Sequence, residues 1–432
     1  MRRRVLVGAI VLAAVAVVVG TSETAADAAT RKPSVFVAPN GNDARSCKRR
    51  RAPCRTFNRA YRAARPGQVV QVAGGRYPGQ TIYAVSGRRG PKVMFRRAPR
   101  ARVLIEGLTF QGADFISVKG MTMTAKRSEP GRGNRQGIFV GPGSRYIKLR
   151  GMRAGNIHTW FADHVVVRGG KYGPCHAVAN APNVCGNSKI DVSTNVTIDG
   201  ALFHDYRFDE SCFAAGNCHW ECLYINGGRN VAIRRSRFRD CAIFDIFVTL
   251  SGPDAARMGH RNLTIENNWF DTPWNENQSG PARAFPTALS LAWCQNSPLG
   301  YRNVRVRFNS FQRNTGIERE PNPACVFDNV RVVGNLLMYP GSCDPQVTYA
   351  YNIWSTAWRR GRCSGTDRIA GNRFPYVNRR SGFRFNFHLR RRETIAHNFV
   401  PRSVGCPRDI DRQRRPMQRR CDAGSDERRF RR

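Results

Sequence analysis

The sequence is short of acidic residues, and this shortage sets its charge. Asp and Glu number 30 against 71 Lys and Arg, so the formal net charge at pH 7 is +41. Nearly all of the basic residues are Arg, whose planar guanidinium matches the geometry of carboxylate and phosphate groups. A surface with this charge attracts polyanions such as acidic polysaccharide, cell-wall polymer or nucleic acid. The alternative is a solvated basic surface with no particular partner.

Long apolar runs are absent after the N-terminus. No later stretch approaches the ~20 apolar residues that a membrane-spanning helix needs. The one apolar run, residues 5–19, follows Arg2, Arg3 and Arg4 and precedes Ala26-Asp27-Ala28. This order is typical of a secretory signal peptide with its cleavage site. We therefore expect an extracellular or cell-surface protein without a membrane span; a retained N-terminal anchor is the alternative.

The sequence also lacks any C-x-x-C pair, and its His residues do not lie near Cys at zinc-finger spacing. No metal site built from Cys and His is therefore expected. The 14 Cys, an even number behind an export signal, indicate disulfides. Pairs that bracket short loops are Cys47–Cys54, Cys175–Cys185, Cys343–Cys363 and Cys406–Cys421, and a consistent set for the others is Cys212–Cys218, Cys222–Cys241 and Cys294–Cys325. Spacing alone does not fix this connectivity.

Helix-period patterns are almost absent after residue 66. The one good helical stretch is residues 56–64 (TFNRAYRAA), where apolar residues recur at i, i+3, i+4 and i+7. Thr56 is a suitable N-cap, and Pro66-Gly67 ends the helix. Strands are expected on both sides of this helix, at residues 35–39 and 69–72.

The remaining chain repeats one phrase. Residues 230–241 read NVAIRRSRFRDC, and related phrases start at Asn195, Asn262, Asn303 and Asn329, with weaker copies at Tyr146 and His164. Starts at 195, 230, 262, 303 and 329 give a spacing of 26 to 41 residues. An imperfect repeat of this length indicates stacked coils or an array.

Within each phrase, apolar residues alternate with polar ones, which predicts a strand with one buried face. Polar turn residues follow, and then an aromatic or Leu residue begins a second short strand. The loops between phrases vary in length, which favours a parallel β-helix whose coils must stack to bury their apolar edges. A β-propeller is the rival fold, but its blades need four strands in a more constant repeat of about 40 to 50 residues.

Three N-terminal segments carry a family resemblance: residues 37–43 (VAPNGND), 52–60 (APCRTFNRA) and 64–77 (ARPGQVVQVAGGRY). Together they resemble the entry segment of secreted bacterial right-handed parallel β-helix proteins of the pectate-lyase-like superfamily. The resemblance implies that residues 35–77 form a strand and a capping helix that close the solenoid. Such a cap is physically required, because an open end exposes the core and an unpaired strand edge.

The C-terminal part is similar to the tail of the same family in the order of its short motifs, at residues 351–354 (YNIW), 386–389 (NFHL), 408–411 (RDID) and 422–427 (DAGSDE). It departs from the family at residues 391–396 (RRETIA) and at Arg412, where the family usually has S-P-A-I-D and Gly. The expected organisation is a signal peptide (1–29), a strand and helix cap (30–80), β-helix coils (81–345), and last coils with an irregular tail (346–432).

The candidate site lies around the central phrases. Many family members carry His-x-Asp-x-x-Gln where this chain has His219, Glu221 and Tyr224. If Leu223, Phe244 or Ile246, Leu289 and Ile317 face inward, then Tyr224, Asp245, Ser290 and Glu318 share an outer column. Because adjacent strands lie ~4.8 Å apart, Asp245 and Tyr224 would then be direct neighbours. His219, Glu221, Tyr224, Asp245 and Glu318 are the candidate catalytic residues, and the alternative is that they pack and fix a loop.

Two reactions on sugars could use such residues. In β-elimination of a uronate, His219 or Tyr224 would be the base and one of four Arg residues would bind the acid group: Arg234, Arg235, Arg237 or Arg239. No cofactor is required by the sequence, although oxygen ligands from Glu221, Asp240 and Asp245 would suit Ca²⁺.

Glycoside hydrolysis would instead use a pair of carboxylates, Glu221 with Asp245 or Asp209 with Glu210. Neither set matches a known catalytic signature. Residues 160–164 (WFADH) are similar to the W-x-D-H of pectate lyases but are one residue too long.

Aromatic residues offer further contacts with sugars. Trp269, Trp274 and Trp293 fall in or beside loops, where an exposed ring can stack on a sugar face and a buried one would only pack. The first hypothesis is a monomeric secreted lyase or glycoside hydrolase acting on an acidic polysaccharide. The second is a non-catalytic protein that binds a polyanionic glycan or cell wall; no specific nucleic acid partner is expected.

Overall fold

The computed structural model describes residues 31–124, 137–177, 186–208, 221–241, 243–271, 288–291, 294, 297–311, 317–318, 325–338, 343–355, 362–371, 375–378 and 386–427. Residues 33–432 form one unit, which is described below. In this described part of the chain, no helix is long and apolar enough to cross a membrane.

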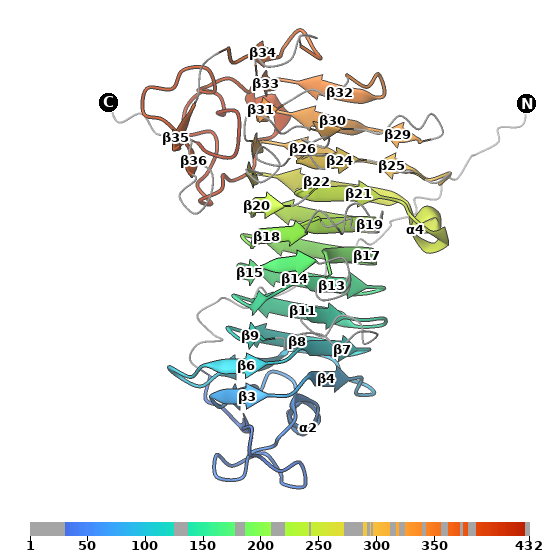
Figure 1. Cartoon of the computed structure of the whole chain (residues 1–432), viewed down its shortest axis with the longest axis vertical. Coiled ribbons are helices and arrows are strands. Elements are labelled where there is room, and N and C mark those ends of the chain that lie inside the picture. The colour runs from blue at the N-terminus through green and yellow to red at the C-terminus, as the bar shows by residue number, and fades with distance from the viewer. Residues whose placement is uncertain are drawn as a thin grey trace, which may run out of the picture. The chain divides into compact units, whose positions relative to one another are not determined.

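Parallel strands stack as rungs in two sheets, one of 21 strands and one of 13 (Figure 1). The larger sheet folds along its length into two faces. Its first face contains β4 (Gln80–Tyr83), β7 (Leu108–Gln111), β10 (Ile138–Val140), β13 (Ile157–Trp160), the first parts of β17 (Ser188–Asp199) and β19 (Leu223–Arg234), β21 (Ile246–Thr249), β24 (Leu289–Leu291) and β28 (Ile317–Glu318).

The second face contains β1 (Val35–Val37), β2 (Val69–Val72), β5 (Val93–Arg97), β8 (Asp114–Lys119), β11 (Arg145–Arg150), β14 (Asp163–Arg168), the second parts of β17 and β19, β22 (His260–Glu266), β25 (Tyr301–Arg302), β26 (Arg305–Arg307), β29 (Phe327–Asp328), β30 (Val330–Val333) and β32 (Val347–Ala350). The third face is the smaller sheet: β3 (Gly75–Tyr77), β6 (Val103–Ile105), β9 (Thr122–Met123), β12 (Arg153–Ala154), β15 (Lys171–Tyr172), β16 (Cys175–Ala177), β18 (Leu202–Phe208), β20 (Arg237–Cys241), β23 (Trp269–Asp271), β27 (Ser310–Phe311), β31 (Leu336–Met338), β33 (Ile353–Trp354) and β34 (Arg368–Ile369).

One coil passes once through each face, as β13, β14 and β15 do in succession. Each of its strands pairs in parallel with the corresponding strands of the coils before and after it. This is a parallel β-helix, so the predicted fold is confirmed and the propeller is wrong.

The first residue of each repeated phrase lies near the start of the second face, at the corner where the chain turns into the main strand of that face. Its backbone is left-handed there, with φ between 52° and 59° at Asn195, Asn230, Asn262, Asn303 and Asn329. Asn tolerates this conformation better than most residues. Four of these Asn side chains, from Asn230 onward, each donate to the side-chain oxygen of the Asn on the coil before at 2.7 to 3.3 Å, which forms an exposed ladder. Asn195 begins the ladder and donates to the Asp163 carboxylate at 2.7 Å. The repeated phrase therefore contains two signals: the alternation of a strand, and an Asn that can adopt the left-handed backbone at the corner.

A second Asn ladder lies inside the later coils. Asn268, Asn309, Asn335 and Asn352 are buried, and each donates its side-chain amide to the next acceptor in line and to a backbone carbonyl. Their side-chain oxygens accept backbone N–H groups, so the polar interior at this turn is satisfied.

Stacked aromatic rings fill the interior beside this ladder. Phe203, Phe238, Phe270 and Phe311 lie on successive coils with ring centroids 4.8 to 5.2 Å apart. They are the inward aromatic residues that the repeated phrase predicts.

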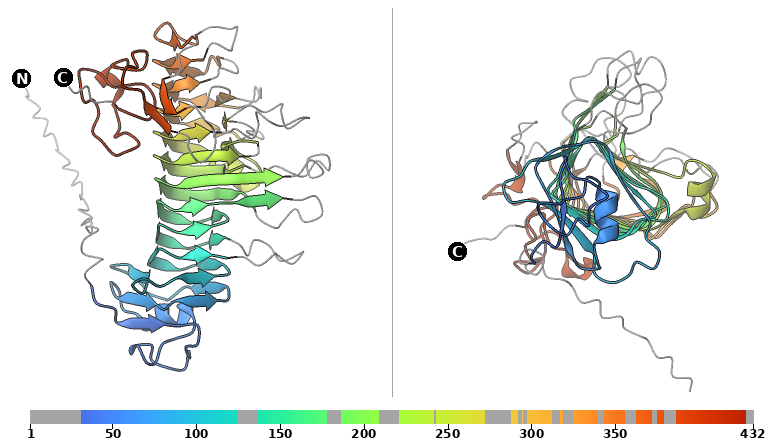
Figure 2. Two further views of the ribbon diagram at one scale, coloured as in Figure 1. Left: turned by 60° about the vertical axis from the view of Figure 1, so that its left-hand side comes forward. Right: turned by 90° about the horizontal axis from the view of Figure 1, so that it is seen from below.

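The N-terminal end is closed as predicted. Helix α2 (Phe57–Ala63) has Thr56 as its N-cap, whose side chain accepts the Arg59 N–H at 3.1 Å. Its inner face buries Phe57 and Tyr61, and the Gln80 side chain accepts the Phe57 N–H at 2.9 Å. Figure 2 shows α2 lying across this end of the coil stack.

The C-terminal segment folds back against the later coils. Strands β35 (Tyr376–Asn378) and β36 (Asn386–Leu389) pair antiparallel, and a single 3-10 turn covers Arg402–Val404. The Tyr376 hydroxyl donates to the Phe311 carbonyl at 2.9 Å, and the Ser425 N–H donates to the Ser310 hydroxyl at 2.9 Å. These bonds hold the tail on the third face beside β27.

Five of the proposed disulfides are present: Cys47–Cys54, Cys222–Cys241, Cys294–Cys325, Cys343–Cys363 and Cys406–Cys421. Cys185, Cys212 and Cys218 lie outside the described residues, so the pairings Cys175–Cys185 and Cys212–Cys218 stay predictions.

We expect Asn309→Ala to lower the free energy of unfolding by about 3 kcal/mol, because it leaves the Ile265 carbonyl and the Asn268 N–H buried without a partner. The control Asn303→Ala, in the exposed ladder, should cost about 1 kcal/mol for a left-handed Ala. Urea unfolding of both variants measures the difference. Equal losses would show that the buried ladder has no special role.

Candidate functional site

The register of the first face corrects the predicted outer column. Tyr224 on β19 pairs with Phe247 on β21, which pairs with Ser290 on β24, and Ser290 pairs with Glu318 on β28. Asp245 lies two residues before Phe247, ahead of the first residue of β21. The prediction that Asp245 and Tyr224 are direct neighbours is therefore wrong. The alternation of residues on a strand fixes which side of the sheet each one faces. It does not fix the pairing register, because a shift of two residues between neighbouring strands leaves the same alternation.

The proposed carboxylate pair is not open to a sugar. Asp245 has no exposed surface, and Glu221 is 1% exposed. The Asn187 amide donates to Glu221 at 2.5 Å, and the Glu221 N–H donates to the Asn187 side chain at 3.1 Å. These bonds make Glu221 a group that ties two coils together.

A different set of polar and aromatic residues lies on the same face, toward the N-terminal coils. Phe139, His158, Lys189 and Tyr224 occupy one outer column on β10, β13, β17 and β19. The adjacent column contains Trp160, Asp191 and Asn226 on β13, β17 and β19. These seven residues are called the Lys189 site below.

Hydrogen bonds and charge hold the centre of the Lys189 site. The Asn226 amide donates to Asp191 at 3.0 Å and to the Ser251 carbonyl at 3.0 Å. The Lys189 ammonium lies 5.3 Å from the centroid of the Tyr224 ring, within cation–π range. Lys189 therefore stands between an aromatic ring on one coil and the imidazole of His158 on the other.

Burial and charge hold His158 in its neutral form. Burial, with a smaller contribution from the Lys189 charge, lowers the pKa of His158 to about 4. Its Nε2 lies 3.9 Å from Asp191 Oδ2, and 18% of the His158 side chain is exposed. The imidazole is thus unprotonated at neutral pH, with a free lone pair on one ring nitrogen, and it is a weak base.

Two other pKa values shift in the opposite direction. Burial raises the pKa of Asp191. Burial, followed by the charge of Glu221, raises the pKa of Tyr224 to about 12, so its phenol keeps its proton at neutral pH. The site therefore combines a neutral imidazole with a protonated phenol on either side of Lys189.

Exposed aromatic rings border the Lys189 site at the corner after β13. Trp160 is 41% exposed and Phe161 is 39% exposed, and their ring centroids lie 5.5 Å apart. Phe139 lies 6.4 Å from Trp160 on the previous coil. Phe161 holds a left-handed backbone with φ of 45°, which is uncommon for a bulky residue and is found at functional sites.

The short helix α4 (Pro253–Met258), which the sequence did not predict, packs against β17 and β19 beside the site. The Ser251 N–H donates to the Asn226 side chain at 2.7 Å, which links the segment before α4 to the Lys189 site.

Other predicted site residues lie away from the Lys189 site and are bonded within the coils. Arg234 forms an ion pair with Glu266 at 3.0 Å, and Arg235 forms one with Asp199 at 2.7 Å, both on the second face. Trp269 is only 1% exposed and packs under the C-terminal segment against Phe387, with their ring centroids 5.8 Å apart. The prediction that Trp269, in or beside a loop, contacts sugar is wrong, because Trp269 lies on β23 on the side that the C-terminal segment covers, while Phe270 is the inward residue of this phrase.

Other predicted site residues are not placed. His219, Trp274, Trp293, Asp209 and Glu210 lie outside the described residues.

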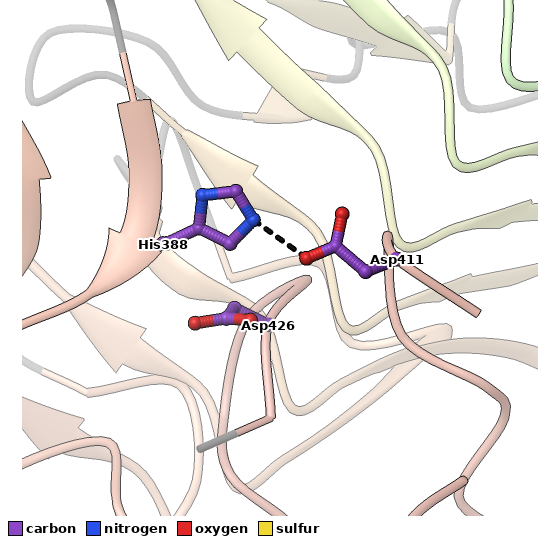
Figure 3. A group of neighbouring side chains, drawn as sticks. All are labelled: His388, Asp411 and Asp426. Atoms are coloured by element: carbon purple, nitrogen blue, oxygen red, sulfur yellow. Dashed lines mark hydrogen bonds and ion pairs between the residues drawn. The ribbon is translucent and has the colours of Figure 1, made fainter. Parts of the chain in front are cut away.

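The residues suggested for Ca²⁺ do not come together as a ligand set. Asp240 forms an ion pair with Arg207, while Glu221 and Asp245 are buried as described above. In the described part of the chain, the one group of three possible ligands is His388, Asp411 and Asp426, whose ligand atoms lie within 4.8 Å of one another (Figure 3).

That group is already bonded within the tail. His388 Nε2 lies 2.8 Å from Asp411 Oδ2, and Asp426 accepts the Leu389 N–H at 2.7 Å. These bonds are enough to explain why the three residues lie together.

Comparison with solved structures finds similar chains at low identity. A crystal structure of pectate lyase Pel9A is 14% identical with a TM-score of 0.46, covering 93% of this chain and 97% of that one. Alginate lyase from Paenibacillus sp. str. FPU-7 is 12% identical with a TM-score of 0.38, covering 72% of this chain and 92% of that one. The catalytic domain of a GH87 α-1,3-glucanase in complex with nigerose is 10% identical with a TM-score of 0.43, covering 79% of this chain and 64% of that one.

No family model and no curated protein matches the chain. Function is therefore inferred from the geometry of the Lys189 site.

The titration of His158 tests this geometry. We expect an NMR titration midpoint for His158 near pH 4. Lys189→Met should raise this midpoint only part of the way toward the usual pKa of ~6.5, because burial is the larger cause of the shift. Lys48→Met, an exposed substitution in the N-terminal cap, should not change it. Because the unfolded imidazole takes up its proton near ~6.5, the stability that His158 contributes is complete above that pH and is lost as the pH falls toward 4. A midpoint near 6.5 in the unsubstituted protein would contradict the burial of this side chain.

Proposed function

We propose that this chain is an extracellular protein that binds an acidic polysaccharide across β13, β17 and β19 and cleaves it by β-elimination. One observation carries the proposal: Lys189 lies between neutral His158 and protonated Tyr224 on consecutive strands, beside exposed Trp160. The disulfides support an oxidising compartment outside the cytoplasm. We propose that the protein acts as a monomer.

Binding combines stacking with charge. The exposed indole of Trp160 offers a flat apolar surface to a sugar ring, while its polar edge stays in contact with water. Lys189 lies on the neighbouring strand and supplies a positive charge for a uronate carboxylate. Strands ~4.8 Å apart place both contacts within one or two sugar rings.

The reaction follows from the protonation states. Lys189 binds the carboxylate and stabilises the negative charge that develops on it when the neighbouring C5–H bond breaks. His158 takes the C5 proton, the electron pair forms the C4–C5 double bond, and the bond from C4 to the glycosidic oxygen breaks. Tyr224 donates its proton to the departing oxygen, and the products are a new chain end and an unsaturated uronate.

A hydrolase is less well supported by the described residues. Glycoside hydrolysis needs two carboxyl groups facing the sugar. Glu221 and Asp245, the pair that the sequence suggested, are both buried.

Non-catalytic binding of an acidic glycan is the second candidate. The pKa values of about 4 for His158 and about 12 for Tyr224 favour it, because acid–base catalysis is most efficient when these values lie near the working pH. Both candidates place the glycan on the Lys189 site and differ only in turnover.

Incubation with polyuronates should release products that absorb in the ultraviolet, as an unsaturated uronate does. Tyr224→Phe and His158→Ala should each lower the rate about 10²- to 10⁴-fold with little change in binding, and Lys189→Ala should weaken both. Lys48→Ala is the matched control and should behave as the unsubstituted protein. The rate should fall as the pH drops through about 4, where His158 gains its proton.

Two results would contradict the proposal of β-elimination. New reducing ends without ultraviolet absorption would indicate hydrolysis. Tight, salt-sensitive binding without any product would leave the non-catalytic glycan-binding protein.

A further inference from the structure

A column of basic residues runs along the end of the second face. Arg96, Lys119, Arg150 and Arg168 occupy equivalent positions on β5, β8, β11 and β14, each paired with the next. Parallel strands place these positions about 4.8 Å apart. These four residues are called the basic ladder, and they lie at the opposite end of β14 from the corner that follows Trp160.

The same column changes character in the later coils. Arg168 pairs with Asp199, and the column continues through Arg234, Glu266 and Arg307. Glu266 binds Arg234 at 3.0 Å and Arg307 at 2.8 Å. Charges therefore alternate in these coils, whereas the earlier coils carry positive charge alone.

Adjacent positive charges in the basic ladder destabilise the folded state. Like charges directly opposite each other on neighbouring strands destabilise a sheet. In the part of the chain that the structure describes, no carboxylate lies within ion-pair distance of Lys119, Arg150 or Arg168. Lys119 and Arg168 are exposed. The later coils show that acidic residues fit this column, so their absence from the earlier coils leaves room for an external anion.

The surroundings of the basic ladder extend the charge and give access. Arg153 and Lys171 are exposed and paired with each other on β12 and β15 of the same coils. The corner between ladder and pair is Gly151 in one coil and Gly169 in the next, both with positive φ. A Cβ built on Gly151 would meet no atom within 4 Å, so a ligand can approach this corner.

We propose that the basic ladder is a binding track for a linear acidic polysaccharide, separate from the Lys189 site. Its charges are arranged in a line along the direction of coil stacking, which suits a polymer with repeated carboxylates better than a compact anion. Neutralising several charges of a polyanion also makes binding strongly dependent on salt. The track goes beyond the proposed function, because it needs no turnover and could hold the protein on a polymer that is cleaved elsewhere or not at all.

One substitution separates this track from a merely solvated surface. Arg150→Glu restores the alternation of charge between Lys119 and Arg168, so the melting temperature should rise. The affinity for immobilised polygalacturonate should fall about tenfold at low salt, since an attraction at the centre of the track becomes a repulsion. Stability and binding should therefore change in opposite directions.

Arg261→Glu is the matched control. Arg261 is exposed and lies between Arg229 and Arg302 on β19, β22 and β25, so the change in charge and the relief of repulsion are the same. It should raise the melting temperature similarly but change polygalacturonate binding less than threefold. If Arg150→Glu does not fold, a double variant of the basic ladder, Lys119→Gln with Arg168→Gln, replaces it. This variant should lose about tenfold in affinity for polygalacturonate. Its control, Arg229→Gln with Arg302→Gln, should lose less than threefold.

Equal losses in the two matched sets would show that net charge alone governs binding and would overturn the proposal. If Arg150→Glu loses binding to anionic vesicles or duplex DNA while its binding to polygalacturonate is unchanged, the assignment of the partner is overturned. Turnover of a short uronate oligosaccharide by Arg150→Glu should equal that of the unsubstituted protein, so failure of the track and failure of the proposed function are distinguishable.

Discussion

The structure depends on a corner at which the backbone must be left-handed. In five phrases the corner residue is Asn195, Asn230, Asn262, Asn303 or Asn329, and its φ lies between 52° and 59°. In three earlier coils Phe115, Tyr146 and His164 hold the same corner with φ between 53° and 57°, and their rings pack against one another with centroids 4.5 to 4.6 Å apart. A ladder of amides or a stack of rings offsets the cost of this conformation. Each coil therefore turns at the same point, and every strand after the corner falls into register with the strands of its neighbours.

Register converts a one-dimensional repeat into columns of side chains. Inward columns fill with Val, Ile and Phe and form the core, which leaves outward columns free to vary from coil to coil. One such column carries Phe139, His158, Lys189 and Tyr224, and another carries the basic ladder. The proposed functions belong to columns across several coils and not to any contiguous motif. This explains why residues distant in sequence make up the Lys189 site and why no catalytic signature is visible in the sequence.

The fold could be predicted from the sequence because its determinants are local. The phrase NVAIRRSRF contains the corner Asn, the alternating strand and the inner Phe, and Thr56 marks the start of the capping helix. Nearby Cys pairs were equally predictable, since each closes a short loop. The packing of the tail over Trp269 could not be predicted, because it joins residues more than 100 positions apart that share no repeated signal.

The site was less predictable because its register depends on the loops between phrases. Phe244 and Ile246 face the same side and are both buried, so alternation allowed either to align with Leu223, and the structure selects Ile246. His158 and Lys189 lie on strands that precede the phrases at His164 and Asn195 and carry no repeated signal of their own. The first residue of each phrase could have located them, because His158, Lys189 and Tyr224 each lie six residues before His164, Asn195 and Asn230, respectively.

The central claim is that an acidic glycan lies across β13, β17 and β19 with a carboxylate on Lys189. A crystal structure of the His158→Ala protein soaked with a short uronate oligosaccharide tests this most directly. The account predicts a sugar ring stacked on Trp160 and a carboxylate within hydrogen-bond distance of Lys189 Nζ. A well-ordered oligosaccharide on another surface, with the Lys189 site empty, would contradict it.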